Sequence, residues 1–135
     1  MMKIDNGSII PGAGIGNVRL GISREELLKI IGEDFQERSL EMGSIITIEN
    51  ANIWIADDGK VDQIGVEKEF GGKYEEVIGL GSTLQDVRQY IGDYVEVYDT
   101  YELKGVKGIC FELEDIDEWN ELKAPIDHIY VFRVE

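Results

Sequence analysis

LGISREELLKIIG, at residues 20–32, is the stretch that decides the predicted fold, because a related stretch occurs a second time. The second copy, LGSTLQDVRQYIG, lies sixty residues further along at residues 80–92 and aligns with the first without a gap. A match of this length between distant segments indicates that the chain contains two related halves.

Both copies carry the signals of a helix start and a helix end. Ser23 precedes Glu26 by three positions, and Thr83 precedes Asp86 by the same spacing. This is the spacing of a capping box, in which the hydroxyl and the carboxylate each accept a bond from an otherwise unpaired backbone amide. Apolar residues follow at helical spacing and a glycine closes each copy. We predict two short amphipathic helices.

After each predicted helix the apolar period changes from 3.6 to two residues, which is typical of strands. Asp57, Asp58 and Gly59 have the composition of a hairpin turn between the second and third strands of the first half. The expected strands are residues 46–49, 53–55 and 61–66 in the first half, and 95–98, 109–113 and 126–134 in the second.

These elements predict an α+β fold. Residues 9–70 and 74–135 would form two tandem helix-plus-three-strand repeats within a single domain, residues 1–135. Neither repeat could bury its apolar face alone, so we expect the strands to form one antiparallel sheet with both helices packed on one face. A chain of 135 residues with 43% hydrophobic content is sufficient for such a core.

The net charge narrows the choice of partners. The chain has 13 basic and 28 acidic residues, which gives a net charge of −15. Nucleic acids and anionic membranes both attract cationic surfaces, so direct binding to either is not expected. A basic protein would be captured quickly by such a field, although solubility alone also explains an acidic composition. The N-terminus lacks a secretory apolar run and no segment is long enough to span a membrane, so we expect a cytoplasmic protein.

Residues that carry catalytic chemistry are sparse. Cys110 stands in an alternating strand pattern where a buried thiol is the ordinary outcome, and His128 is the single histidine. Residues 11–16 are rich in glycine but do not open a helix after a strand, as a phosphate cradle requires. We therefore predict no enzyme, no cofactor and no metal. The alternative is a small-ligand or enzymatic module in a cleft between the repeats around His128.

Acidic and aromatic residues suggest where a partner would bind. Residues 93–121 hold ten carboxylates and two lysines, a local net charge of −8. Trp119 lies among these acids, which resembles an interface anchor, although it could equally pack on the core. The last strand is apolar on both faces, so Tyr130 would face a partner beside Trp54 unless other segments cover it. The candidate partner-binding residues are Trp54, Asp57, Asp58, Glu112, Glu114, Asp115, Asp117, Glu118, Trp119, Glu121 and Tyr130.

Two resemblances extend this interpretation. Residues 20–32 resemble the recurring helix unit of the beta-lactamase inhibitor protein and outer-membrane assembly lipoprotein folds. In the inhibitor protein two such units stand in tandem. The chain lacks the disulfides and the signal of those families, so the resemblance supports the layout alone. Residues 10–21, IPGAGIGNVRLG, resemble the opening of small cytosolic bacterial proteins, some of which are similar to immunity proteins of contact-dependent or polymorphic toxin systems. This implies a cytoplasmic inhibitor that neutralises the basic C-terminal domain of a toxin, commonly a nuclease.

Overall fold

The computed structural model describes residues 3–134 and is dominated by antiparallel β-structure. The two helices are α1 (Arg24–Ile31) and α2 (Leu84–Tyr90). A small sheet contains β1 (Ile9–Ile10), β2 (Gly14–Ile15) and β3 (Val18–Arg19). The large sheet contains β4 (Gln36–Ser39), β5 (Ser44–Ile48), β6 (Ala51–Ile55), β7 (Val61–Val66), β8 (Tyr94–Val97), β9 (Thr100–Leu103), β10 (Ile109–Leu113) and β11 (Ile126–Phe132).

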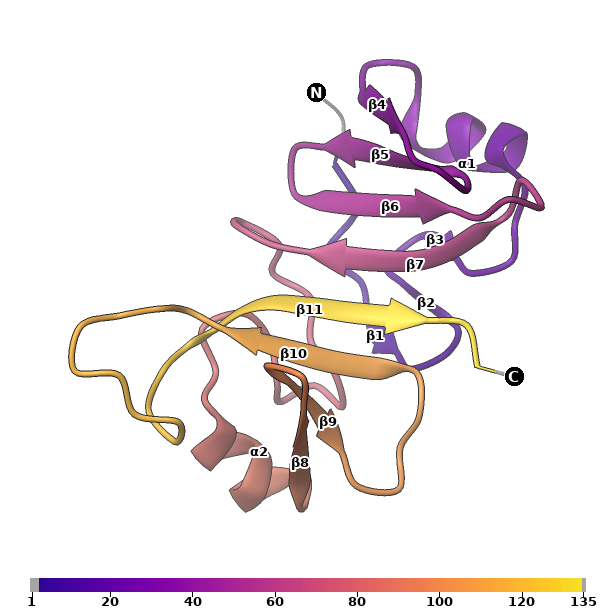
Figure 1. The fold of residues 1–135 in the computed structure, drawn as a ribbon. Coiled ribbons are helices and arrows are strands. Elements are labelled where there is room, and N and C mark those ends of the chain that lie inside the picture. Colours follow the sequence, from indigo (N-terminus) through magenta and orange to yellow (C-terminus); the bar gives the residue numbers. More distant parts are fainter. Residues whose placement is uncertain (1–2, 135) are drawn as a thin grey trace.

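The strand order of the large sheet is β4-β5-β6-β7-β11-β10-β9-β8. The four strands that follow α1 therefore occupy one half of the sheet, and the four that follow α2 occupy the other (Figure 1). β7 and β11 pair antiparallel at the centre, where Gly65 lies opposite Tyr130. β11, the last strand, which has apolar residues on both faces, is thus a central strand of the sheet.

Both helices begin as the sequence predicts. The Ser23 hydroxyl accepts a bond from the Glu26 amide at 3.1 Å, and the Glu26 carboxylate accepts one from the Ser23 amide at 3.2 Å. Thr83 and Asp86 make the same pair of bonds at 3.2 and 3.0 Å. The two capping boxes are confirmed, and they explain why the helix starts keep the sixty-residue offset. The side chains that the helices bury are Leu27, Ile31, Leu84 and Val87.

The predicted fold class is wrong. The helices cover only eight and seven residues, whereas the large sheet has eight strands and a second sheet has three. The prediction missed β4 because its sequence, QERS, has no apolar residue; β4 is an edge strand whose four residues are all exposed. It missed β9 because the turn before it, Tyr98 and Asp99, adopts positive φ angles of 49° and 66° without the Asn-Gly or Asp-Gly sequence that announces such a hairpin.

The turn predicted at residues 57–59 is confirmed. Gly59 has a φ angle of 81° and its amide donates to the carbonyl of Ala56 at 2.9 Å. This turn joins β6 to β7 and aligns their inward-facing residues, such as Ile53 opposite Ile64.

One face of the large sheet forms the core. Alternate strand residues are fully buried in a single cluster with the helices and the small sheet, for example Ile53, Ile64, Ile129 and Phe111. In Figure 1 the small sheet lies behind the large one, on this buried side. The opposite face carries half-buried side chains, and no helix or strand within residues 3–134 packs over it. We call it the open face.

Neither helix within residues 3–134 has the length and apolar character needed to cross a membrane.

Candidate functional site on the open face

The open face carries one continuous row of residues across all eight strands. Alternation along a strand places every second residue on the same face, and the pairing register then aligns these residues between neighbours. The row in sheet order is Gln36, Thr47, Asn52, Gly65, Tyr130, Cys110, Glu102 and Val95.

An aromatic pair occupies the middle of this face. Trp54 of β6 and Tyr130 of β11 meet edge to face, with ring centroids 6.0 Å apart. Gly65 of β7 lies between them, and a Cβ atom placed on Gly65 would be only 2.5 Å from the Tyr130 ring and 3.4 Å from the Trp54 ring. The two rings can therefore close over the central strand only because that position lacks a side chain.

Tyr130 is also held from its other side. Its hydroxyl donates to the Glu112 carboxylate of β10, and its ring is nearly parallel to that of His128, with centroids 5.9 Å apart. Burial and the hydrogen bond to Glu112 raise the pKa of the Tyr130 phenol, so the hydroxyl remains a donor at neutral pH. These contacts fix the orientation of the ring.

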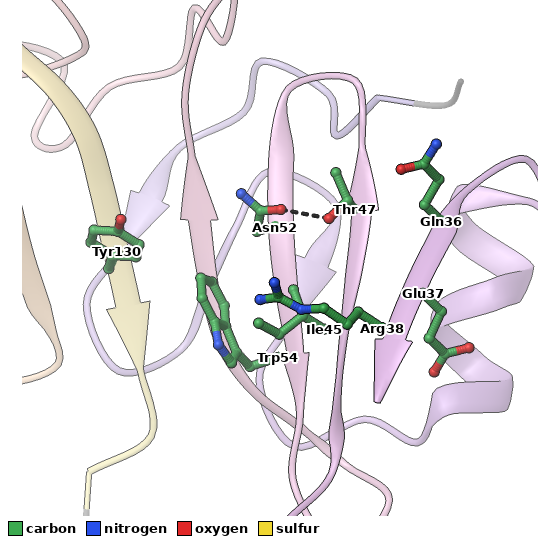
Figure 2. Close-up of a pocket in the computed structure, with 8 residues that line it drawn as sticks. All are labelled: Gln36, Glu37, Arg38, Ile45, Thr47, Asn52, Trp54 and Tyr130. Atoms are coloured by element: carbon green, nitrogen blue, oxygen red, sulfur yellow. Dashed lines mark hydrogen bonds between the residues drawn. The ribbon is translucent and has the colours of Figure 1, made fainter. Parts of the chain in front are cut away.

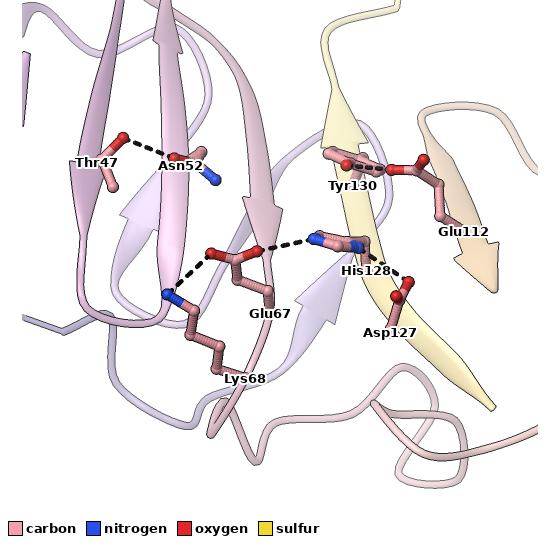
Figure 3. A network of polar contacts seen from close by, with 8 residues as sticks. All are labelled: Thr47, Asn52, Glu67, Lys68, Glu112, Asp127, His128 and Tyr130. Atoms are coloured by element: carbon pink, nitrogen blue, oxygen red, sulfur yellow. Dashed lines mark hydrogen bonds and ion pairs between the residues drawn. The ribbon is translucent and has the colours of Figure 1, made fainter. Parts of the chain in front are cut away.

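His128 links the two halves of the sheet (Figure 3). Its Nε2 lies 2.7 Å from Glu67 on the β7 side, and its Nδ1 lies 2.9 Å from the neighbouring Asp127 carboxylate. Carboxylates only accept hydrogen bonds, so both ring nitrogens donate and the doubly protonated imidazolium is favoured. Burial lowers the pKa of His128, but the bonds to Asp127 and Glu67 outweigh burial, and the net shift is upward. Lys68 contacts Glu67 at 3.6 Å.

The pKa of His128 should lie above the ordinary value near 6.5 and should fall when Glu67 is replaced by glutamine. The raised pKa means that the ion pairs contribute fully below about pH 6.5 and that their contribution is lost as the pH rises through the folded-state pKa. An NMR titration of the imidazole protons measures this directly, since the chain contains one histidine. Glu69→Gln is the matched control, because Glu69 faces Lys3 at 3.7 Å. A pKa unchanged by Glu67→Gln would refute the assignment.

A hollow of about 490 Å³ lies on the open face next to the aromatic pair (Figure 2). In Figure 2 the Arg38 side chain reaches across β5 toward Trp54, whereas Glu37 points away from it. The Thr47 hydroxyl donates to Asn52 Oδ1 at 2.7 Å on the hollow's wall. We call this the aromatic hollow; its lining residues are Gln36, Glu37, Arg38, Ile45, Thr47, Asn52, Trp54 and Tyr130.

A second hollow, of about 510 Å³, lies where β8, β9 and β10 meet the segment that follows β10, which contributes Asp115 and Trp119. Four carboxylates and two aromatic rings line it, and no basic residue does. Burial and the nearby carboxylates of Glu96 and Glu121 raise the pKa of Tyr101 to about 12. We call this the acidic hollow; its lining residues are Glu96, Asp99, Tyr101, Glu112, Leu113, Asp115 and Trp119.

The structure brings some predicted partner-binding residues together and separates others. Trp54, Tyr130 and Glu112 form one connected group on the open face, and Glu112 also lines the acidic hollow with Asp115 and Trp119. The remaining residues fall into different surroundings.

Asp57 and Asp58 line a further hollow of about 550 Å³ that shares Trp54, and Asp58 pairs with Arg133 at 3.3 Å. The Glu121 carboxylate is used internally, because it accepts from the hydroxyls of Tyr94 at 2.8 Å and Tyr101 at 3.4 Å. The other three, which are exposed and line neither the aromatic nor the acidic hollow, are Glu114, Asp117 and Glu118.

Sequence reasoning missed the polar residues around the aromatic pair. Thr47 lies on a predicted strand, and Asn52 directly precedes the strand predicted at residues 53–55, so their shared face with Trp54 could have been found by extending the period of two by one residue. Glu67 falls just after a predicted strand and carries no signal of its own. Arg38 could not be placed, because the strand that carries it was not predicted.

Cys110 lies beside Tyr130 in the row and is half-buried. Burial and the carboxylates of Glu102 and Glu112 raise its pKa to about 12. The thiol is therefore protonated at neutral pH, whereas nucleophilic cysteines depend on the thiolate. Among residues 3–134, no group of three or more potential ligand side chains is arranged to hold a metal ion.

Fold and site together define an open-faced antiparallel sheet protein whose uncovered face is aromatic at its centre and acidic toward one end. No family model matches the chain, and no curated protein is similar to it in sequence. A solved structure that is similar to it is that of the uncharacterized protein yfeY from Escherichia coli, with a TM-score of 0.53 and 12% identity. The match covers 97% of this chain and 99% of the other. At this identity the likeness concerns the fold alone.

Proposed function

We propose that the protein is an inhibitor-type binding protein that occludes a cationic surface of a partner protein. The observation that carries the proposal is the acidic hollow, in which four carboxylates surround Tyr101 and Trp119 without a basic residue. A lysine or arginine side chain gains both ion pairing and a cation–π contact in such a setting. Trp119 is 49% exposed, so its ring is available to a partner.

Neighbouring residues extend the proposed surface in two directions. Tyr98, at the turn between β8 and β9, is 96% exposed, and it adjoins Asp99 of the acidic hollow. On the other side Glu112 joins the acidic hollow to Tyr130 and hence to the aromatic pair. A surface with aromatic anchors and a charged rim has the composition of a protein interface.

The class of partner follows from charge and from the family resemblance. A net charge of −15 opposes binding to nucleic acids and speeds encounter with a basic protein. The resemblance of residues 10–21 to immunity proteins makes a basic toxin domain the partner that we propose, and the cytoplasm the compartment. In this function the protein acts by covering a surface, and no bond is made or broken.

Reversing two carboxylates of the acidic hollow should slow association with a basic toxin domain encoded beside this gene. We expect Glu96→Lys with Asp115→Lys to reduce the association rate about tenfold at low salt, because the long-range attraction is locally inverted. The measurement is stopped-flow association of the purified pair over a range of salt concentrations, together with protection of cells that express the toxin.

The matched control is Glu33→Lys with Glu76→Lys, which makes the same change in net charge at two exposed residues outside the hollow. At about 0.1 M salt this control should slow association less than the reversal in the hollow does, since charges more than about 10 Å from the interface are largely screened at that ionic strength. If the two double variants slowed association equally, the change in net charge alone would explain the effect. If the association rate changed neither with the charge reversals in the acidic hollow nor with the salt concentration, the proposed surface would be ruled out.

A further inference from the structure

We propose that the aromatic hollow is a second binding site, which takes a carboxylate attached to an aromatic or other apolar group. This inference does not rest on the proposed function, because it concerns a different hollow with the opposite charge preference. It depends on three features: a cation that has no partner among residues 3–134, an amide donor on the hollow's wall, and two aromatic rings that line it.

The cation is Arg38. Within residues 3–134 the other arginines are engaged: Arg24 pairs with Glu37, Arg133 pairs with Asp58 and Asp62, Arg88 lies over Tyr94, and Arg19 donates to backbone carbonyls. Arg38 makes no ion pair or hydrogen bond there, although the protein carries more than two acids for each base. Its guanidinium thus presents an unused fork of donors, a geometry that matches a carboxylate.

Glu37, the acid next to Arg38, does not neutralise it. Side chains of adjacent strand residues point to opposite faces, and the Glu37 carboxylate accepts from Arg24 at 3.2 and 2.5 Å and from Ser44 at 2.8 Å. The bond to Arg24 lowers the pKa of Glu37, so this acid stays ionised and paired with Arg24; Glu37 borders the hollow, but its side chain points away from Arg38 (Figure 2).

The second donor comes from Asn52. Its Oδ1 accepts from the Thr47 hydroxyl, which leaves the amide nitrogen on the side that faces Tyr130 in Figure 2. Thr47 therefore acts as a positioning residue that sets the orientation of the Asn52 amide. Donors from Arg38 and Asn52 then border the same hollow.

The aromatic rings that line the hollow determine what the ligand carries besides its carboxylate. Trp54 and Tyr130 form an aromatic boundary, and the Tyr130 hydroxyl is already bonded to Glu112, so the ring offers an apolar surface to the hollow. Glu112 lies beyond Tyr130 and repels an anion there. A ligand would therefore place its carboxylate toward Arg38 and its apolar part against Trp54 and Tyr130. A volume of about 490 Å³ falls in the range of small-molecule sites.

Phenylacetate and its neutral isostere phenylacetamide are the probes that test this site. In NMR spectra of ¹⁵N-labelled protein, phenylacetate should shift the Asn52 side-chain amide and the Trp54 indole signal, with a dissociation constant on the order of millimolar. Phenylacetamide should bind at least about tenfold more weakly, because it lacks the negative charge that would pair with the Arg38 guanidinium.

Arg38→Gln should weaken phenylacetate binding about tenfold, whereas Arg88→Gln, at an exposed arginine outside the hollow, should leave it unchanged. Both variants alter exposed side chains, and an unchanged backbone spectrum verifies that they fold. The peptide Gly-Gly-Phe with a free C-terminus is compared with its amide and with phenylacetate to identify the source of the carboxylate. Tighter binding of the peptide than of phenylacetate indicates a chain terminus. Equal binding of the two indicates a small acid.

Three results would overturn the proposal. The first is equal binding of phenylacetate and phenylacetamide, and the second is binding that persists unchanged in Arg38→Gln. The third is the absence of any shift at Asn52 and Trp54 up to the solubility limit of the probe.

Discussion

Replacing Asn50 with alanine is expected to lower the free energy of unfolding by about 2–4 kcal/mol. Asn50 lies in the turn between β5 and β6, is 3% exposed, and is the buried polar residue of the core. Its Oδ1 accepts from the amide of Ile4 at 2.9 Å, and its Nδ2 donates to the carbonyl of Ile4 at 3.0 Å. The side chain thereby fastens the N-terminal segment to the large sheet.

The variant can take either of two routes, and their expected costs overlap in the range of about 2–3 kcal/mol. If Ile4 stays buried, its amide and carbonyl lose their partners, at about 1–3 kcal/mol for each unsatisfied group. If the segment detaches, water satisfies both groups but the burial of the Ile4 side chain is lost, which is worth about 1.5–3 kcal/mol. Urea denaturation measures the difference.

Asn6→Ala is the matched control for Asn50. The Asn6 carboxamide accepts from the Gly71 amide at 2.9 Å in a similar long-range contact, but the residue is exposed. Water can replace this bond, so the expected loss is below about 1 kcal/mol. If the two variants were destabilised equally, burial would not be the reason for the role of Asn50.

Replacing Gly65 with alanine is expected to destabilise the protein by about 1–3 kcal/mol, as overpacking does. The added methyl group would lie 2.5 and 2.6 Å from two atoms of the Tyr130 ring. Contacts with His128 and the hydrogen bond to Glu112 prevent the ring from moving away without loss. Urea denaturation gives the stability, and the NMR indole signal of Trp54 reports the disturbed pair.

A double-mutant cycle separates this clash from a general effect on the strand. In a Tyr130→Ala background the ring is absent, and Gly65→Ala should become neutral or slightly stabilising, because glycine is unfavourable inside a strand by roughly 0.5–1 kcal/mol. A cost that is the same in both backgrounds would show that Tyr130 is not what Gly65 accommodates.

The molecule presents two chemically different hollows to possible partners. The aromatic hollow is lined by residues of β4, β5, β6 and β11 and contains an arginine that has no ion pair within residues 3–134, whereas the acidic hollow lies at the ends of β8, β9 and β10 and has carboxylates as its charged groups. Glu112 and Tyr130 connect them in the middle. A partner that covered both hollows would need a cationic segment at one and a carboxylate at the other, which restricts its orientation.

The sequence by itself determined the features that depend on near neighbours in the chain. The capping boxes at Ser23 and Thr83 and the turn at Gly59 are local, because the bonded groups lie within three residues of one another. Strands with alternating apolar residues, such as β6 and β11, could be recognised for the same reason.

Only the tertiary structure decided the fold class, the strand order and the two hollows. The polar edge strand β4 has no apolar alternation to reveal it, and its pairing with β5 is what brings Arg38 beside Trp54. The contact between Gly65 and Tyr130 joins residues sixty-five positions apart through the central pairing of β7 with β11. Such contacts form from long-range register, whose energy comes from burying one whole face of a sheet, and no short stretch of residues encodes that energy.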